Sequence, residues 1–261
     1  MKKLMIAAVA SMAAVGAFAV ESANVVGYLQ SDKGQGVDMA AAAFDTVGGG
    51  EVDVQSLLPV VGGEEELYSG GFMLMTLTDA GETEETYIYT LAADAPDGKD
   101  GWFDSVTGER VVKTFKPGEG FVTVSDYEGG KLQSAGQVSD SASVFVLRTG
   151  VNGCGNTTSA AVSIEDVGVG VGVDAEGNLL TVNPDNDEEL YSGGIMIMTL
   201  TDGGETDKTY IYTLAADASD GVAGWFDSVT GERVSINILA GAGFVVVSDY
   251  TEGCISLPSA L

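Results

Sequence analysis

The sequence contains no histidine, and its 261 residues include 2 cysteines, 5 prolines and 11 lysines and arginines. Without histidine there can be no Ser-His-Asp triad, no Cys-His pair, no His-ligated zinc and no imidazole that titrates near neutral pH. The aspartates and glutamates number 39 and far exceed the lysines and arginines, so the formal net charge is −28. Such a surface repels phosphate backbones and anionic lipids, so we expect no nucleic-acid partner, whereas it attracts cations such as calcium.

The first residues have the pattern of an export signal. Lys2 and Lys3 form a positive start, residues 4–18 are apolar and rich in alanine, and residues 17–19 (AFA) supply a small-x-small cleavage site. The pattern predicts a signal peptide over residues 1–19, cleaved after Ala19. The alternative is an uncleaved anchor, but a membrane-spanning helix needs about 20 apolar residues. No later segment approaches that length, so we expect an exported mature chain without a membrane span, extracellular, on the cell surface or in the periplasm.

The two cysteines, Cys154 and Cys254, are predicted to form one disulfide. Their number is even, and the export route leads to an oxidising compartment. A bridge across so long a loop would stabilise the fold by roughly 4–5 kcal/mol in the chain-entropy model. The alternative is a pair of free, buried thiols.

An internal repeat organises the chain. Residues 68–127 and 191–250 are identical at 44 of 60 positions, at an offset of 123 residues. A period of about 120 residues is typical of tandem domains rather than of solenoid repeats. We therefore expect two units, residues 20–140 and 141–261. No Pro-rich or Gly/Ser-rich linker separates them, which predicts that the units are closely docked.

The secondary-structure signal is β in both units, because short apolar, β-branched or aromatic segments alternate with Gly-rich turns. A hairpin loop is expected at residues 105–108, with Gly108 in the left-handed conformation. Two short helices are expected at residues 39–44 and 54–58. The pattern favours an all-β protein of two tandem β-sandwich-like domains. The predicted strands are 72–78, 86–91, 102–104, 110–112, 120–125, 144–147, 160–164 and 195–201.

Several segments, taken in order, resemble a class of exported bacterial proteins whose function is unknown. Those proteins open with ANVVGY after a signal peptide and close with a PGxGF strand followed by GQV. The resemblance covers residues 20–138 and implies export without assigning an activity. The second copy lacks the opening and the GQV, and it has residues 240–244 (AGAGF) in place of PGxGF. The matching segments are 23–28 (ANVVGY), 44–50, 56–59, 86–89, 101–104, 117–121 (PGEGF) and 135–138 (AGQV).

Acidic loops recur in both copies and are candidate calcium sites. Asp94 and Asp97 lie in one loop, and Asp185 and Asp187 lie in another that is denser in oxygen ligands. Neither loop matches the D-x-[DN]-x-[DN]-G pattern, and aspartates are common in turns because they bond to the local backbone. Turn formation is the favoured interpretation. No other metal or cofactor is expected.

Asp104 and Glu109 flank one predicted hairpin and could supply the acid and nucleophile of a glycosidase. Arg110 follows them, and a hairpin tip is exposed, so neither carboxyl is expected to have a raised pKa. A charged hairpin end is the favoured interpretation, and no catalytic residue is assigned.

Two equivalent aromatic sets could stack against sugar rings. In each copy two tyrosines share one face of a strand and a tryptophan follows. The alternative, which is favoured, is packing in a core and across strands. The sets are Tyr87, Tyr89 and Trp102 in the first copy, and Tyr210, Tyr212 and Trp225 in the second.

One difference between the copies concerns charge. Lys113 and Lys116 of the first copy become Ile236 and Leu239 in the second. The same segment is thus more apolar in the second copy, which predicts that this face is buried against the first copy or against another molecule. Ile236 and Leu239 are therefore candidates for self-association.

Together these observations favour an exported, non-catalytic structural or cell-surface protein. Its expected partner is another copy of itself, in a filament or layer, or a component of the envelope, because strand edges can pair between subunits. The alternative is a carbohydrate-binding or adhesive module whose loops calcium braces. The third hypothesis, an enzyme, would need a mechanism built on carboxylates alone.

Overall fold

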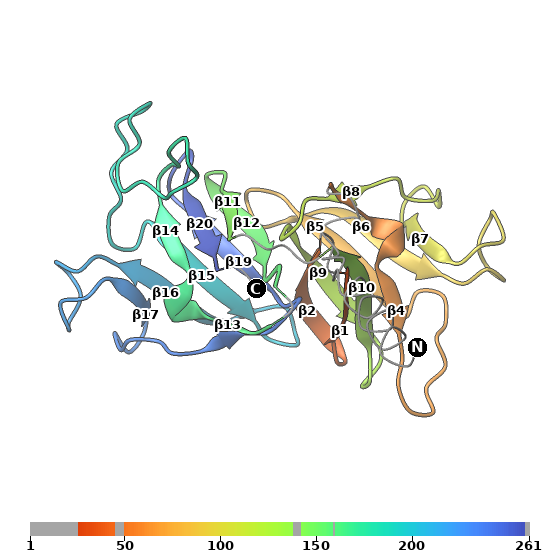
Figure 1. Cartoon of the computed structure of the whole chain (residues 1–261). Coiled ribbons are helices and arrows are strands. Elements are labelled where there is room, and N and C mark those ends of the chain that lie inside the picture. Colours follow the sequence, from red (N-terminus) through yellow and green to blue (C-terminus); the bar gives the residue numbers. More distant parts are fainter. Residues whose placement is uncertain (1–25, 45–49, 138–141, 159, 259–261) are drawn as a thin grey trace, which may run out of the picture.

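The chain is almost entirely β-structure. A computed structural model describes residues 26–44, 50–137, 142–158 and 160–258. The structure is 46% strand and 3% helix, so the all-β prediction is confirmed. Its small sheets are arranged in a ring, in the manner of a four-bladed propeller (Figure 1). The predicted signal peptide, residues 1–19, and the predicted boundary between residues 140 and 141 involve positions outside the described residues.

The first half forms three sheets. The orders are β1-β10-β4, β2-β9-β5-β6-β7 and β3-β8, and the described pairings are antiparallel. A single 3₁₀ turn, η1 (Val54–Ser56), follows β3. The strands are β1 (Val26–Asp32), β2 (Gly36–Ala41), β3 (Val52–Asp53), β4 (Leu58–Val60), β5 (Phe72–Leu77), β6 (Thr83–Thr90), β7 (Gly101–Asp104), β8 (Thr114–Phe115), β9 (Gly120–Ser125) and β10 (Lys131–Gln137).

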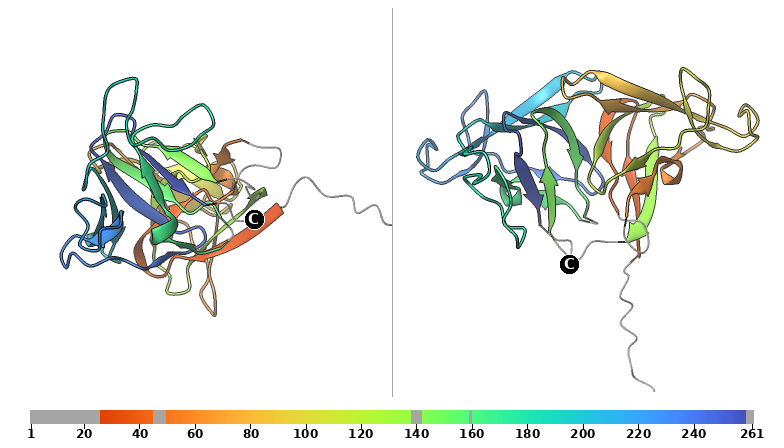
Figure 2. Two further views of the ribbon diagram at one scale, coloured as in Figure 1. Left: turned by 60° about the vertical axis from the view of Figure 1, so that its left-hand side comes forward. Right: turned by 90° about the horizontal axis from the view of Figure 1, so that it is seen from above.

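The second half repeats this topology strand for strand. Its sheets are β11-β20-β14, β12-β19-β15-β16-β17 and β13-β18, and a 3₁₀ turn, η2 (Ile164–Asp166), follows β13. The two halves lie side by side (Figure 2). The strands are β11 (Ser143–Val146), β12 (Gly150–Gly155), β13 (Val162–Ser163), β14 (Gly168–Gly170), β15 (Ile195–Leu200), β16 (Thr206–Thr213), β17 (Gly224–Asp227), β18 (Asn237–Ile238), β19 (Gly243–Ser248) and β20 (Cys254–Leu257).

The predicted strands at residues 72–78 and 195–201 correspond to β5 and β15, which occupy the centre of the two five-stranded sheets. Both faces of β5 are apolar because the two faces have different partners. Phe72 and Leu74 pack into the core of the first half, whereas Met75 and Leu77 pack against the second half. The predicted hairpin is also present, with Gly108 at φ 70°. Residues 110–112 form only a bridge between Arg110 and Phe103 rather than a strand.

The two expected helices are wrong. Residues 39–41 belong to β2, where Met39 pairs with Val122 of β9. The alanine-rich composition of this segment favours a helix, but pairing with β9 and burial of the alanines override that weak local preference. Residues 54–58 supply only the turn η1, which Asp53 caps by accepting a hydrogen bond from the Gln55 N–H.

Each half has its own core, and a third cluster joins the halves. Met39, Val122 and Val245 are its buried members, and the outward faces of both five-stranded sheets pack around them. Val37 N–H donates to the Asp202 carbonyl (2.7 Å), and Val151 N–H donates to the Asp79 carbonyl (2.8 Å).

These cross-half contacts are equivalent by position. Val37 and Val151 each follow the glycine that begins β2 or β12, while Asp79 and Asp202 are one repeat apart. Two further strand bridges between the halves are related in the same way. Ala40 pairs with Ala242, and at the equivalent positions Cys154 pairs with Glu119. The halves therefore meet like the subunits of an isologous dimer about an approximate twofold axis.

The close approach of the halves requires glycine at two equivalent positions. Gly36 and Gly150 have φ of 112° and 94°, where side chains are rarely tolerated. A Cβ at either position would also meet the carbonyl oxygen of Asp202 or Asp79. The cross-half hydrogen bonds therefore depend on the absence of a side chain.

No helix in the described part of the chain has the length and hydrophobicity that a membrane crossing requires.

Candidate functional site

The aromatic sets lie inside the two cores. Trp102 and Trp225 are 0% and 1% exposed, and their indole N–H groups donate to the carbonyls of Leu57 (2.7 Å) and Val167 (3.1 Å). Tyr89 and Tyr212 pack edge-on against these tryptophans. Tyr87, Tyr89 and Tyr210 are buried, and Tyr212 is partly buried. The ligand-stacking hypothesis is wrong at these residues, because their rings fill the cores instead of forming an open platform.

The acidic loops are tied into local structure. Asp97 accepts two hydrogen bonds from Arg110, at 2.5 and 3.0 Å, and this pairing lowers the pKa of Asp97 to about 2. Asp94 accepts from the Ser69 hydroxyl. Asp185 and Asp187 are exposed. Among the described residues no three carboxylates, thiols or imidazoles come together to hold a metal ion. Calcium binding stays a prediction.

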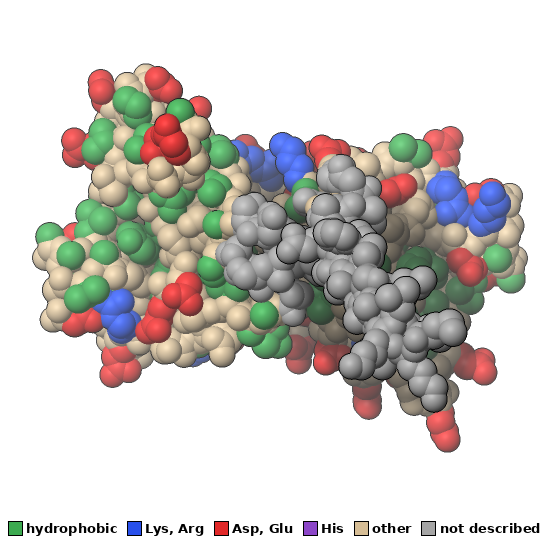
Figure 3. Space-filling model, in the orientation of Figure 1, with side chains coloured by type: hydrophobic (Ala, Val, Ile, Leu, Met, Phe, Trp, Pro, Cys, Tyr) green, Lys and Arg blue, Asp and Glu red, His purple; other side chains and the backbone are tan. Residues whose placement is uncertain are grey.

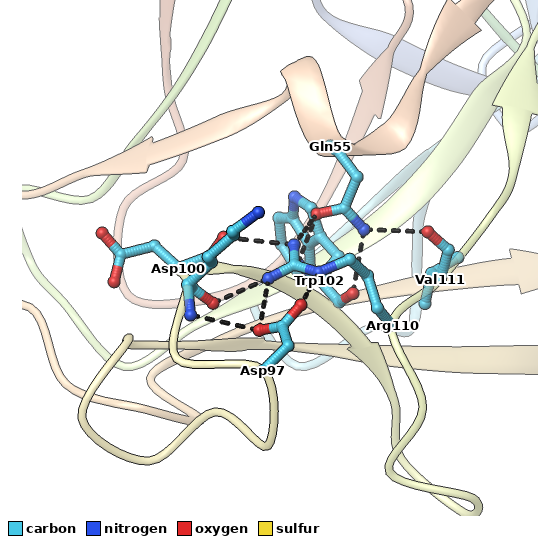
Figure 4. A network of polar contacts seen from close by, with 7 residues as sticks. Gln55, Asp97, Asp100, Trp102, Arg110 and Val111 are labelled. Atoms are coloured by element: carbon cyan, nitrogen blue, oxygen red, sulfur yellow. Dashed lines mark hydrogen bonds and ion pairs between the residues drawn. The ribbon is translucent and has the colours of Figure 1, made fainter.

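Arg110 is the centre of a network that joins the loop to the core (Figure 4). Its Nη1 donates to Gln55 Oε1 (2.9 Å), and its guanidinium lies 4.7 Å from the centre of the Phe103 ring. Gln55 also accepts from the Trp102 N–H and donates to the carbonyls of Trp102 and Val111. The geometry is that of a structural brace, which ties the loop of Asp97 to the core through Arg110 and Gln55.

The hairpin carboxylate Asp104 caps its own turn. It accepts hydrogen bonds from the N–H groups of Val106 (2.9 Å) and Thr107 (2.7 Å), which lower the pKa of Asp104. A glycosidase acid needs the opposite shift. The hairpin-end interpretation of Asp104 and Glu109 therefore agrees with the geometry.

The predicted disulfide is not formed. Cys154 on β12 and Cys254 on β20 are free, buried and located in different sheets. Burial raises the pKa of Cys154 to about 12 and that of Cys254 to about 11, so both thiols stay protonated and unreactive at neutral pH. The alternative of two buried thiols describes the structure.

The two self-association candidates differ in exposure. Ile236 is partly buried against the core of its own half, so its apolar character has an explanation within the domain. Leu239 is 65% exposed. Of the predicted pair, only Leu239 presents a largely open apolar surface.

A hollow lies at the junction of the halves. We call it the seam groove and define it by Lys113, Lys116, Phe145, Arg148 and Cys154, with a volume of about 730 Å³. One wall is the β8–β9 segment of the first half, and the other is formed by β11 and β12 of the second half. Gly118 makes this junction possible, because a Cβ there would collide with the Phe145 ring.

The seam groove collects bases in a chain that has few. Lys113 pairs with Glu85 at 3.0 Å. Arg148 donates to the carbonyls of Leu77 (2.8 Å) and Val151 (3.3 Å), so backbone from both halves orients its guanidinium. Neither Arg148 nor Lys116 has a carboxylate partner among the described ion pairs. Glu84 and Glu119 also line the groove.

A second polar cluster borders the groove. Glu85 accepts from the Tyr87 hydroxyl (2.5 Å) and from Lys113 (3.0 Å), and these contacts lower the pKa of Glu85. Burial, together with the Glu85 hydrogen bond, raises the pKa of Tyr87. Glu85 is thus held as a carboxylate and Tyr87 as a phenol, which suits a fixed surface rather than proton transfer.

The sequence does not predict the seam groove, although two of its three bases stand out in the comparison of the two copies. The aligned differences Lys113/Ile236 and Lys116/Leu239 draw attention to the apolar copy, whereas the groove lies beside the basic one. Arg148 had no signal, because only the packing of the halves brings β11 and β12 to the β8–β9 segment.

Comparison of the chain with protein-family models, with curated proteins and with solved structures gives no match.

Proposed function

We propose that the chain is an exported, non-catalytic structural protein that associates with copies of itself, in a filament, a layer or an envelope-bound assembly. The observation that carries the proposal is the packing of its two halves. They have the same topology and meet through equivalent surfaces, as in an isologous dimer. The molecule therefore already contains one association between two units of this fold.

We further infer that each half is a sandwich-like domain derived from one duplicated unit. In the first half, Leu132 of the sheet β1-β10-β4 packs in one core with Phe72, Leu74 and Phe121 of the five-stranded sheet. The same arrangement recurs in the second half, where Ile255 packs with Ile195, Ile197 and Phe244. The 44 identities in 60 aligned residues support the duplication.

Leu239 offers a contact for further association. Its 65% exposure is high for a large apolar side chain, and it lies where the first half has Lys116. Burying a leucine side chain contributes about 1.5–3 kcal/mol. The carbohydrate-binding alternative lacks a comparable observation, because the aromatic rings on which it depends are buried.

The test uses the mature chain, residues 20–261, in sedimentation velocity and negative-stain electron microscopy, with and without calcium. We expect concentration-dependent assemblies. Leu239→Lys should raise the concentration needed for assembly by about tenfold or more, because the contact loses apolar burial and gains a charge.

The matched control is Val229→Lys, which introduces the same charge at a 91% exposed position elsewhere in the same half. It should assemble like the unmodified chain. A chain that remains monomeric at every concentration, in both calcium conditions, would contradict the proposed function.

A further inference from the structure

The seam groove is the main concentration of bases on a strongly acidic molecule. Nine of the eleven lysines and arginines belong to the described residues, and three of them line this groove. Figure 3 shows basic side chains at the upper junction of the halves, with further basic side chains toward both ends of this face and acidic side chains around them. Lys116 and Arg148 lack a carboxylate partner among the described ion pairs, although Glu84 and Glu119 also line the groove, so these two cations are the groups that an acidic ligand can pair with.

The fold does not require this charge. Lys33 N–H donates to the Gly130 carbonyl and Leu147 N–H to the Gly253 carbonyl, so Lys33 and Leu147 are equivalent. The next residues, Gly34 and Arg148, are then equivalent too. The second junction consequently carries Ile236, Leu239 and Gly34 where the seam groove carries three bases. The second junction therefore has the same backbone contacts between the halves without basic side chains at these positions.

The geometry of the groove favours carboxylates. Arg148 is held by two backbone carbonyls, which fixes its guanidinium and lowers the entropy lost on pairing. Lys116 is exposed, and its flexible ammonium can follow a ligand. Phe145 and Pro117 supply apolar surface beside the two cations. A segment that carries two free carboxylates is the chemical complement of these two cations.

The chain itself carries such a segment in the loop between β4 and β5. Glu64, Glu65 and Glu66 are consecutive and exposed, and the loop contains no base. Glu65 is used internally, because it accepts hydrogen bonds from the N–H groups of Glu128 and Gly129. No hydrogen bond or ion pair among the described residues engages the carboxylates of Glu64 and Glu66.

The positions of loop and groove make the contact intermolecular. In Figure 1 this loop projects from the lower edge of the first half, whereas the junction of β11 with the first half faces the upper edge. The loop and the groove of one molecule thus point to different sides in this view, and we take the contact to be between molecules. A surface that contacts a different surface on the next molecule gives a head-to-tail arrangement, which grows into a filament unless the rotation closes a ring.

We propose that the acidic loop of residues 62–67 of one molecule docks in the seam groove of the next, where Glu64 and Glu66 pair with Lys116 and Arg148. This inference rests on the proposed function and specifies its contact. The apolar patch at Leu239 lies outside this contact and acts separately.

The experiment compares charge-reversed variants of the mature chain by sedimentation velocity. The groove variant is Lys116→Glu/Arg148→Glu, and the loop variant is Glu64→Lys/Glu66→Lys. Each alone should require a roughly tenfold or higher concentration to assemble, as expected for the loss of two ion pairs. Mixed in equal amounts, the two variants should regain assembly as an alternating polymer. The basic loop of the loop variant meets the acidic groove of the groove variant, and the unchanged acidic loop of the groove variant meets the unchanged basic groove of the loop variant.

Controls with the same charge changes lie elsewhere on the surface. Lys99→Glu/Lys208→Glu matches the groove variant, and Glu176→Lys/Asp185→Lys matches the loop variant. Both controls should assemble like the unmodified chain. Recovery of assembly in the mixture also shows that the two reversed variants are folded, since unfolded chains would not restore the contact.

The outcomes separate this inference from the proposed function. If the unmodified chain assembles and the groove variant assembles equally well, the docking contact is wrong while self-association stands. If the unmodified chain remains monomeric, both are overturned. If it remains monomeric yet binds poly-glutamate in a manner that Lys116→Glu/Arg148→Glu abolishes, the occupant of the groove is an acidic polymer and not a second copy.

Discussion

The two junction sites between the halves share one backbone geometry and differ in charge. The cross-half hydrogen bonds, the strand bridges and the glycines at the start of β2 and β12 obey the twofold exchange. The side chains at the rim do not obey it. Lys113 and Lys116 at one junction correspond to Ile236 and Leu239 at the other. The backbone contacts between the halves are therefore the same at both junctions, whereas the side chains at the rim differ.

A buried position shows the same divergence at higher energetic cost. Lys33 is 5% exposed, and its Nζ pairs with Asp38 (3.0 Å) and donates to the Met39 carbonyl (2.9 Å). Burial lowers the pKa of Lys33, although Asp38 opposes the shift. At the equivalent sites the second half has Leu147 and Asn152. One fold thus accommodates either an ion pair or an apolar residue with a neutral amide.

The strongest test of this equivalence is to place a lysine at the equivalent position of the second half, where no aspartate is available to pair with it. Leu147→Lys should lower the free energy of unfolding by about 3–5 kcal/mol, because Asn152 cannot compensate a buried ammonium. Urea denaturation measures the change. Val146→Lys, at the adjacent 64% exposed position, should stay within about 0.5 kcal/mol of the unmodified chain.

Adding Asn152→Asp to Leu147→Lys should recover part of the loss, because it recreates the pair seen at Lys33 and Asp38. No recovery would mean that the two sites are not interchangeable, despite their equivalent hydrogen bonds.

A smaller difference is expected at the turns η1 and η2. Gln55 makes hydrogen bonds to Trp102, Arg110 and Val111, whereas Glu165, at the same position of η2, is exposed. Gln55→Ala should therefore cost about 1–3 kcal/mol of stability, because it leaves partly buried polar groups unpaired. Glu165→Ala is the matched control and should change stability by less than about 0.5 kcal/mol. Equal losses in the two variants would be evidence against the brace.

The smallest effect concerns a feature that the halves share. Tyr68 donates to Asp126 (2.6 Å) and Tyr191 to Asp249 (2.7 Å), and each hydrogen bond raises the pKa of its tyrosine from 10.0 to about 12. Because the pKa is higher in the folded state, the stabilisation is complete below pH 10 and is lost as the pH rises from about 10 to about 12.

Titration of tyrosinate absorbance tests this symmetry. Asp126→Ala should return the pKa of Tyr68 toward 10, and Asp249→Ala should do the same for Tyr191. Glu64→Ala, an exposed carboxylate change elsewhere in the first half, should leave both transitions in place. A pKa change in only one of the two variants would show that the two tyrosine sites are not equivalent.

Local patterns were sufficient for much of the fold. The apolar run at residues 72–78 and the β-branched segment at residues 86–91 correspond to β5 and β6, and turn chemistry placed Gly108. The helix expected at the alanine-rich segment, residues 39–44, was wrong. Helix propensity contributes little free energy, and pairing with β9 decides the conformation of this segment. The disulfide expectation failed for a related reason, since cysteine number and compartment carry no information about which sheets contain Cys154 and Cys254.

The sequence by itself determined the all-β class, the repeat and the scarcity of bases, because each is a property of composition, local periodicity or self-alignment. Only the tertiary structure decided which aromatic rings are buried, how the halves exchange hydrogen bonds and where Arg148 lies relative to Lys113 and Lys116. These features depend on hydrogen-bond register and on the packing of sheets from distant segments. Two strands with the same pattern can bury either face, and the choice is made by the surface they meet.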